Sequence, residues 1–489
     1  MPAWIEPARR LPPWAAADTR QPPQRGVLGA DGVRWRAAGT DWVGVEHTTG
    51  GWAMLSTAER SRLEAADGSV VDLSGADHWA VPLWRRGLVS LDGETALGGV
   101  DWDACVEQTR EHYGLILVLN SGCNLACTYC YLGHASPGGQ NDADPGLVTA
   151  ALDAAMRRPE ATILVDFGEI AAAPRLFRTA LAYARRRADE AGKHLRVAVQ
   201  TNATTLGDDL LDLLVGNDVL IGVSLDGPEA LHDRARTLRS GRGTHAKVTG
   251  SLARCRDRGL PFHLIVTVGA HNVAAPDEVL DEIARQAPAS FLCKPVLAHG
   301  EADAGWREVG ASPDAIAHFL RRTVERAAGS GLGMLDQSAG KFLARMLGDP
   351  YGWRDGCTSR HCGSGRSLHV LSARGEVHAC PRFVTPGQGA RVDGRTVGLQ
   401  ILKRAGTLDH ALHTAPETCG GCPWLRSCGG GCTLSGQHGD SGVVPLPDEH
   451  CASYTAQHEE IVAKLLPALV SGRIPLDGPL TGAKVVTGA

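Results

Sequence analysis

The stretch Leu115-Ile-Leu-Val-Leu119-Asn-Ser-Gly-Cys123-Asn-Leu-Ala-Cys127-Thr-Tyr-Cys130 joins a short apolar run to three cysteines. The run from Leu115 to Leu119 predicts a buried strand. Three thiolates from the loop after it can hold three irons of a 4Fe-4S cluster and leave the fourth iron open to another ligand. The alternatives are a partial zinc site or ordinary core cysteines. A structural zinc site needs four ligands, however, and no nearby cysteine or histidine pair completes the set.

Composition restricts the class of protein. At 489 residues the chain is long enough for two or three domains, and its apolar share of 43% and charged share of 21% are typical of a globular protein. A net charge of -5 argues against nucleic acid or an anionic membrane as the main partner. No apolar run has the length of a membrane span, and the start of the chain has no apolar signal core. These features predict a cytoplasmic protein.

Most of the fourteen cysteines fall into two groups. Three form the triad above, and eight lie between Cys357 and Cys451. In a cytoplasmic protein this usage indicates metal or redox chemistry more often than disulfides. Cys105, Cys255 and Cys293 stand alone, which favours a plain buried role for each.

The chain before the triad divides into two parts. Residues 1–27 are rich in proline and poor in apolar positions, which predicts disorder. Residues 28–105 begin with strand-like runs, Val33 to Arg36 and Asp41 to Val45. A helix follows at Ser56 and Glu59, which have capping-box spacing, and a second short helix ends at Arg86, with a strand expected at Leu88-Val89.

From residue 106 to 300, strands alternate with helices, which indicates a parallel sheet. Six strand and helix units are too few to close an eight-stranded barrel, so we expect an α/β fold with an open, partial (β/α)6 TIM-type barrel. Residues at the carboxyl ends of its strands should form the site. The helices are expected at stretches such as Pro174 to Ala191 and His245 to Arg258. The expected strands are Leu115 to Leu119, Ile163 to Val165, Leu195 to Gln200, Val219 to Ser224, Phe262 to Val268 and Phe291 to Val296.

The C-x3-C-x2-C spacing behind a strand resembles that of the radical S-adenosylmethionine (SAM) superfamily. The resemblance implies a 4Fe-4S cluster on Cys123, Cys127 and Cys130 as the catalytic centre, with SAM bound at the open iron and Tyr129 beside its adenine. Gly168-Glu169 match half of the family's Gly-Gly-Glu-Pro motif, while Phe167 and Ile170 replace the flanking residues. Glu169 is accordingly expected to receive the SAM amino group.

The next strand ends also resemble family motifs. Asn202 belongs to a turn similar to the family's Thr-Asn-Gly, with Ala203 in place of glycine. Ser224-Leu-Asp226-Gly-Pro, with Arg236 and the following Gly-rich turn, is similar to a passage of peptide-modifying members. By position, Ser224 and Arg236 approach the ribose or carboxylate of SAM. The predicted SAM-binding set is Tyr129, Gly168, Glu169, Asn202, Ser224, Asp226 and Arg236.

The C-terminal cysteines resemble the SPASM pattern, a module with two further 4Fe-4S clusters. Gly375 stands five residues before Cys380, as in that pattern. Eight thiolates suit two fully ligated clusters, which brings the expected total to three; a pair of structural zinc sites is the alternative. By resemblance, one cluster takes Cys357, Cys362, Cys380 and Cys432, and the other takes Cys419, Cys422, Cys428 and Cys451.

Members with SPASM modules modify peptides or proteins through a 5'-deoxyadenosyl radical. The resemblance therefore implies a ribosomally made precursor peptide as substrate and an electron donor such as flavodoxin or ferredoxin. In sulfatase-maturating members an aspartate follows the third cysteine of the first auxiliary cluster, whereas Pro381 follows Cys380 here. This favours peptide crosslinking or another peptide modification over formylglycine formation. Epimerisation stays an alternative, although it needs a hydrogen-atom donor and the positions of Cys255 and Cys293 suit neither to that role. The alternative from another class is a non-catalytic iron-sulfur electron carrier or peptide-binding scaffold.

Residues 28–105 also resemble, in their order of strands and short helices, the small winged-helix module that binds leader peptides as an added strand. A plain structural lid is the alternative. The predicted organisation is a disordered segment (1–27), a winged-helix-like domain (28–105), the radical SAM partial barrel (106–300), a helical linker (301–356), the SPASM domain (357–455) and a C-terminal helix and tail (456–489).

Overall fold

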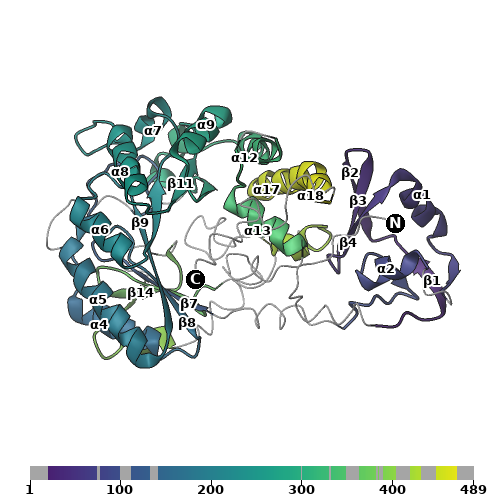
Figure 1. Ribbon diagram of the computed structural model, residues 1–489, viewed down its shortest axis with the longest axis horizontal. Coiled ribbons are helices and arrows are strands. Elements are labelled where there is room, and N and C mark those ends of the chain that lie inside the picture. Colours follow the sequence, from purple (N-terminus) through teal and green to yellow (C-terminus); the bar gives the residue numbers. More distant parts are fainter. Residues whose placement is uncertain are drawn as a thin grey trace.

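The computed structural model describes residues 20–73, 78–99, 112–132, 141–298, 300–329, 332–347, 363–381, 384, 389–402, 419–430 and 448–470. Cys105, Cys357, Cys362 and Cys432 lie outside these ranges. In Figure 1 the parallel sheet and its helices form one end of an elongated molecule, and the N-terminal strands form the other. Within the described ranges, no helix has the length and apolarity needed to cross a membrane.

The central sheet has nine strands in the order β12-β11-β10-β9-β8-β7-β13-β14-β15. The six strands from β7 to β12 are parallel and follow the sequence order, as expected from the alternating pattern. Strand β13 joins the sheet parallel to β7, and β14 and β15 continue it antiparallel. The strands are β7 (His112–Leu117), β8 (Thr162–Asp166), β9 (His194–Thr201), β10 (Leu220–Ser224), β11 (Phe262–Val268), β12 (Ser290–Pro295), β13 (Leu368–Leu371), β14 (Glu376–His378) and β15 (Ala390–Arg391).

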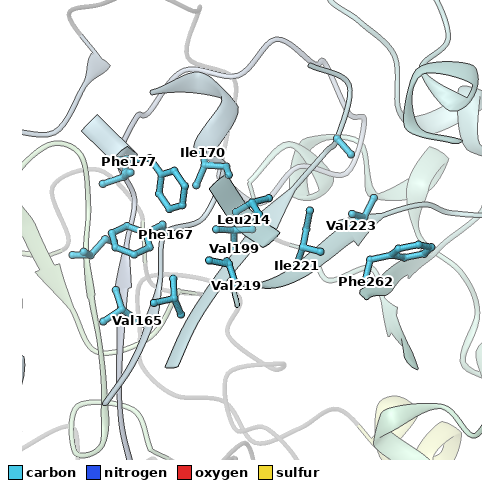
Figure 2. Packing of buried hydrophobic residues seen from close by; sticks show 14 of the residues in the cluster. Val165, Phe167, Ile170, Phe177, Val199, Leu214, Val219, Ile221, Val223 and Phe262 are labelled. Carbon is cyan, nitrogen blue, oxygen red and sulfur yellow. The ribbon is translucent and has the colours of Figure 1, made fainter. Parts of the chain in front are cut away.

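Helices cover one face of this sheet because alternate strand residues are apolar. Figure 2 shows Val165, Val199 and Ile221 from three strands packing with Phe177 and Leu214 from two helices. Each such side chain contributes about 1.5–3 kcal/mol when fully buried. The helices between the strands are α4 (Pro145–Met156), α5 (Pro174–Ala191), α6 (Asp208–Gly216), α7 (Glu229–Ala235), α8 (His245–Asp257) and α9 (Pro276–Gln286).

Capping residues and a proline in the sequence mark the ends of several of these helices. Helix α5 spans the predicted range, with Pro174 in its first turn and Gly192 as a left-handed cap at φ 63°. The Asp144 side chain caps α4 by accepting a hydrogen bond from Leu147 N. Four helices follow the sixth parallel strand: α10 (Glu301–Ala304), α11 (Trp306–Val309), α12 (Pro313–Ala328) and α13 (Gln337–Met346).

The N-terminal part contains two three-stranded sheets, ordered β5-β1-β6 and β2-β3-β4. The capping box at Ser56 and Glu59 is confirmed. Two details differ from the prediction: the first strand begins at Arg25, inside the segment predicted to be disordered, and the last is Ser90–Leu91 rather than Leu88-Val89, because Leu88 N still bonds to Leu83 O of the preceding helix. The elements are β1 (Arg25–Gly29), β2 (Val33–Ala38), β3 (Asp41–Glu46), β4 (Trp52–Ser56), α1 (Thr57–Ala66), β5 (Val70–Asp72), α2 (Ala80–Arg85) and β6 (Ser90–Leu91).

The β2-β3-β4 sheet packs on C-terminal helices rather than on the parallel sheet. Val43 and Val45 share a core cluster with Phe342, Trp424 and Ile461. Polar contacts reinforce it: Trp52 Nε1 donates to Met346 O at 2.6 Å, and an Arg36–Glu459 ion pair spans 2.8 Å. Figure 1 shows this helical layer between the two ends of the molecule. It contains α13, α16 (Leu425–Cys428), α17 (Asp448–Glu460), the π-helix Ile461–Leu465 and α18 (Leu466–Val470), while α14 (Val397–Leu402) packs on α4.

Candidate functional site at the carboxyl ends of the parallel strands

The cysteine loop follows β7 and is fixed by the segment after α7. Backbone hydrogen bonds join Ala126 N to Thr237 O (2.9 Å) and Thr128 N to Ala235 O (3.0 Å), and Leu125 forms an antiparallel bridge with Leu238. The loop residues 125–128 are therefore paired with residues 235–238 in the manner of two short antiparallel strands. The cysteines Cys123, Cys127 and Cys130 belong to one small apolar cluster with Tyr129, Val296 and Trp306.

The triad thiols are shielded from water and close to one another. Burial raises the pKa of Cys127 to about 12, and the neighbouring Cys130 and Cys123 add to that shift. Burial also raises the pKa of Cys123. Within the described ranges, no three Cys, His, Asp or Glu side chains converge closely enough to hold a metal ion. The loop thus supplies the three thiols that a 4Fe-4S cluster needs, and all three pack in the same group of apolar side chains. Their sulfur atoms do not point at one common position in this structure.

Asp226, just after β10, is the centre of a buried polar cluster. Its Oδ2 accepts hydrogen bonds from the Tyr129 hydroxyl and from Arg236 Nε (2.9 Å), and its Oδ1 accepts one from Thr267 N (2.9 Å). His271 Nε2 lies 3.4 Å from Oδ2. Three predicted site residues, Tyr129, Asp226 and Arg236, are therefore brought together.

Arg236 determines the charge state of this cluster. Burial alone would raise the pKa of Asp226, but Arg236, followed by the nearby His271 side chain, holds that pKa well below its usual range. The Arg236 guanidinium carbon also lies 5.3 Å from the centre of the Tyr129 ring, at cation-π distance. Tyr129 is thus positioned through its hydroxyl and its ring at once.

Glu169, after β8, accepts hydrogen bonds only from neutral groups in the described chain. Thr201 Oγ1 donates to Oε1 at 2.8 Å, Asn202 N donates to Oε2 at 2.7 Å, and Ala171 N donates to Oε1 at 3.1 Å. Burial raises the pKa of Glu169, and these hydrogen bonds offset only part of that shift. The carboxylate is well oriented, and among the described residues none forms an ion pair with it.

Asn202 links Glu169 to the cysteine loop. Its side chain donates from Nδ2 to Asn124 Oδ1 (3.1 Å), and Asn124, one residue after Cys123, donates to Thr204 Oγ1 (2.8 Å). Ala203 has φ 55°, a left-handed conformation that favours glycine. This explains why the related turns carry glycine there.

The other predicted residues also lie at this edge of the sheet. Ser224 ends β10 and is buried. Gly168 has φ 57°, and its backbone N donates to the Asp166 carboxylate at 2.8 Å, so it forms the tight turn that directs Glu169 toward β9.

Sequence reasoning missed His271 and Asn124. His271 stacks on Tyr129 with ring centroids 5.5 Å apart and an interplanar angle of 23°. It lies shortly after β11, so extending the strand-end rule to that strand would have found it. Asn124 lies inside the cysteine motif, but no local signal indicates its partners Asn202 and Thr204 in the turn after β9.

Five of the eight C-terminal cysteines are described. Cys380 follows β14, and Cys422 and Cys428 pack against the core cluster that contains Trp424. Burial raises the pKa of Cys422, and nearby Cys451 adds to the shift, which indicates that α17 and the Cys422 segment are neighbours. The three remaining cysteines, Cys357, Cys362 and Cys432, lie outside the described residues.

Residues 117–283 match the family model of the Radical SAM superfamily. The chain is 24% identical over 359 residues to the serine-type anaerobic sulfatase-maturating enzyme of Bacteroides thetaiotaomicron, covering 65% of this chain and 82% of that protein. Among solved structures it is similar to native anSMEcpe with bound AdoMet and Kp18Cys peptide (TM-score 0.63, 19% identity, 74% of this chain and 100% of that chain). It is also similar to Streptococcus suis SuiB bound to S-adenosylmethionine (TM-score 0.50, 12% identity, 83% and 95%). At these identities the structural matches establish the fold.

Proposed function

We propose that this chain, a radical SAM enzyme related to the anaerobic sulfatase-maturating enzymes, cleaves S-adenosylmethionine reductively and modifies a ribosomally made peptide. Cys123, Cys127 and Cys130 would hold the 4Fe-4S cluster, which when bound supplies the electron that releases a 5'-deoxyadenosyl radical. The protein's own residues orient SAM and the peptide and exclude water.

The observation that carries the proposal is the uncompensated carboxylate of Glu169. It is half-buried, accepts hydrogen bonds from three neutral donors, and is connected through Asn202 and Asn124 to the triad loop. A carboxylate that is partly shielded from water and has no cation beside it is disfavoured in its charged form, and a bound ammonium group would stabilise that form. The amino group of SAM is such a cation, which supports the predicted role of Glu169 despite the altered residues on either side of it.

Asp226 would act through its neighbours. All of its described contacts are made within the protein, to Tyr129, Arg236, Thr267 and His271. Its proposed role is to position the Tyr129 ring for the adenine and to orient Arg236 toward the SAM carboxylate. Ser224, at the end of β10, would approach the ribose or carboxylate of SAM.

The two auxiliary clusters are also proposed. The first would use Cys357, Cys362, Cys380 and Cys432, and the second Cys419, Cys422, Cys428 and Cys451. The proximity of Cys422 and Cys451 supports the second set. An external flavodoxin or ferredoxin would supply electrons, and residues 28–105 would bind the leader of the peptide.

Two outcomes compete for the modification itself. The relatives named as sulfatase-maturating enzymes favour formylglycine formation. Pro381 after Cys380 favours crosslinking, because it leaves out the carboxylate expected there in those relatives. Epimerisation has less support, since Cys255 and Cys293 are buried in the core cluster that includes the helix side of the sheet. Homology to enzymes sets aside the non-catalytic scaffold.

The first test is SAM cleavage by reconstituted, dithionite-reduced protein, with 5'-deoxyadenosine as the product measured. Changing Cys123, Cys127 and Cys130 together to Ala should abolish cleavage and leave about eight of twelve irons. Loss of every iron in this variant would contradict the assignment of the clusters. Absence of 5'-deoxyadenosine from the wild type, with peptide present, would overturn the proposal.

Mass spectrometry of a co-expressed precursor peptide then separates the modifications. A crosslink removes two hydrogens and gives no aldehyde, whereas formylglycine reacts with a hydrazide reagent. Unchanged mass with altered chirality in the hydrolysate would indicate epimerisation.

A further inference from the structure

An arginine-lined cleft of about 730 Å³ lies beside the first parallel strand, outside the Asp226 and Glu169 clusters. Its walls come from the start of α4, the first turns of α5, the β13–β14 turn and β15. A cleft of this size is within the range that holds a small ligand or a short piece of peptide. Apolar atoms of Leu147, Leu176 and Val392 contribute to the lining.

Three arginines reach the cleft from three different elements. Arg175 lies on α5, Arg374 in the β13–β14 turn and Arg391 on β15, and all three are exposed. None of them forms an ion pair within the described chain, whereas Arg187 on α5 and Arg326 on α12 are paired with carboxylates. Three unpaired guanidinium groups around one cleft repel one another, and an anionic ligand would relieve that repulsion.

The acidic residues of the cleft are already used. Asp142 accepts a hydrogen bond from the Asn120 amide, and Asp144 caps α4 through Leu147 N at 2.9 Å. Neither carboxylate is ion-paired with a described arginine of the cleft. The arginines therefore remain available to a ligand.

The cleft is connected to the cysteine loop. Asn120 and Asp142 form an antiparallel bridge, and Asn120 Oδ1 accepts from Gly122 N at 2.6 Å, directly before Cys123. The turn with Arg374 belongs to the hairpin that leads to Cys380.

We propose that this cleft binds an acidic segment of the peptide substrate, rich in Asp and Glu, and holds it beside the cysteine loop. The inference rests on the proposed function, because it names the chemistry of the substrate of that same site. Arginine forks pair with carboxylate side chains, while the apolar lining accommodates the peptide between them.

The test measures binding of fluorescein-labelled octaglutamate to the full-length reconstituted enzyme by fluorescence anisotropy. Changing Arg175, Arg374 and Arg391 together to Glu should weaken binding about tenfold or more, since several exposed charge pairs become repulsive. Wild-type affinity should fall as salt rises. The matched control changes Arg234, Arg242 and Arg321 to Glu; these residues are also exposed, lie outside the cleft and alter the net charge equally.

Equal binding by the cleft variant and the wild type would overturn the inference, as would the absence of octaglutamate binding to the wild type. If the cleft variant instead binds octaglutamate normally but is reduced more slowly by an acidic flavodoxin, the cleft serves the electron donor and the inference is wrong. Peptide-independent formation of 5'-deoxyadenosine should be unchanged in both variants. This measurement distinguishes the two failures. If the wild type forms no 5'-deoxyadenosine, the proposed function is wrong; if it forms 5'-deoxyadenosine but the cleft variant binds octaglutamate as the wild type does, the inference alone is wrong.

Discussion

Glu169 and Asp226 are carboxylates at the ends of strands two positions apart in the sheet; Asp226 is fully buried, Glu169 is half-buried, and the charges nearest to them differ. Asp226 has Arg236 as a partner, which lowers its pKa, whereas the described partners of Glu169 are all neutral donors and burial raises its pKa. Burial therefore does not by itself determine the state of a carboxylate; the nearest charge does. A compensated carboxylate suits a structural role, and an uncompensated one suits recognition of a cation.

The largest effect is expected for Asp226→Asn. The change leaves Arg236 buried without its anionic partner, which should lower the free energy of unfolding by about 3–5 kcal/mol. Urea denaturation followed by circular dichroism measures this. Asp212→Asn, which breaks a surface ion pair with Arg258, is the control and should change stability little. If Asp226→Asn were as stable as Asp212→Asn, the Asp226–Arg236 pair would be no more important than a surface ion pair. The distinction between Asp226 and Glu169 would then be lost.

Glu169→Gln should weaken SAM binding about 10-fold to 100-fold, because hydrogen bonds to a charged group contribute roughly 1.5–3 kcal/mol. The glutamine keeps one acceptor oxygen, for Asn202 N, and its amide group can donate to Thr201 Oγ1, whose hydroxyl also accepts, so the fold should persist. Equilibrium dialysis with cluster-loaded protein measures the affinity. Glu229→Gln, at an exposed position on α7, is the control. Wild-type affinity in the Glu169 variant would show that the SAM amino group binds elsewhere.

The pH dependence of stability should have opposite signs for the two carboxylates. The raised pKa of Glu169 gives a contribution that is present below the ordinary glutamate pKa and lost as pH rises through the raised value. Glu169→Gln should therefore gain stability relative to wild type as pH rises from acid toward neutral. Asp226, with a lowered pKa, contributes above the ordinary aspartate pKa, so Asp226→Asn should lose relative stability over the same change. Parallel urea titrations across that pH range measure the free energy of unfolding of each variant relative to the wild type. If this difference changed with pH by the same slope in both variants, the comparison would be contradicted.

The smallest effect concerns the turn that holds Glu169. Ala203→Gly relieves a left-handed conformation costing about 1–2 kcal/mol but removes a buried methyl group contributing about 0.8 kcal/mol. The expected net gain is below about 1 kcal/mol. Ala287 is left-handed but exposed, so Ala287→Gly should give the larger rise in melting temperature. The reverse order would indicate that the Ala203 turn is not strained.

Much of the fold could be predicted because its signals are local. The alternation of apolar residues gave the six parallel strands, and Pro174 and Gly192 marked the ends of α5. The addition of β13 to β15 to the same sheet was not predicted, since pairing of β7 with β13 joins residues far apart in the chain. The packing of the N-terminal sheet on α13 and the Trp424 segment was missed for the same reason.

By itself, the sequence determined the chemistry available to this protein: three thiols at fixed spacing after a strand, and polar residues at successive strand ends. The tertiary structure decided which of those residues act together. Tyr129 and Asp226 are 97 residues apart yet share a hydrogen bond. Arg236 compensates the charge of Asp226, whereas the described hydrogen-bond partners of Glu169 are neutral. Spacing within a loop is encoded by a few adjacent residues, whereas charge compensation depends on strand order and register, which only the folded chain establishes.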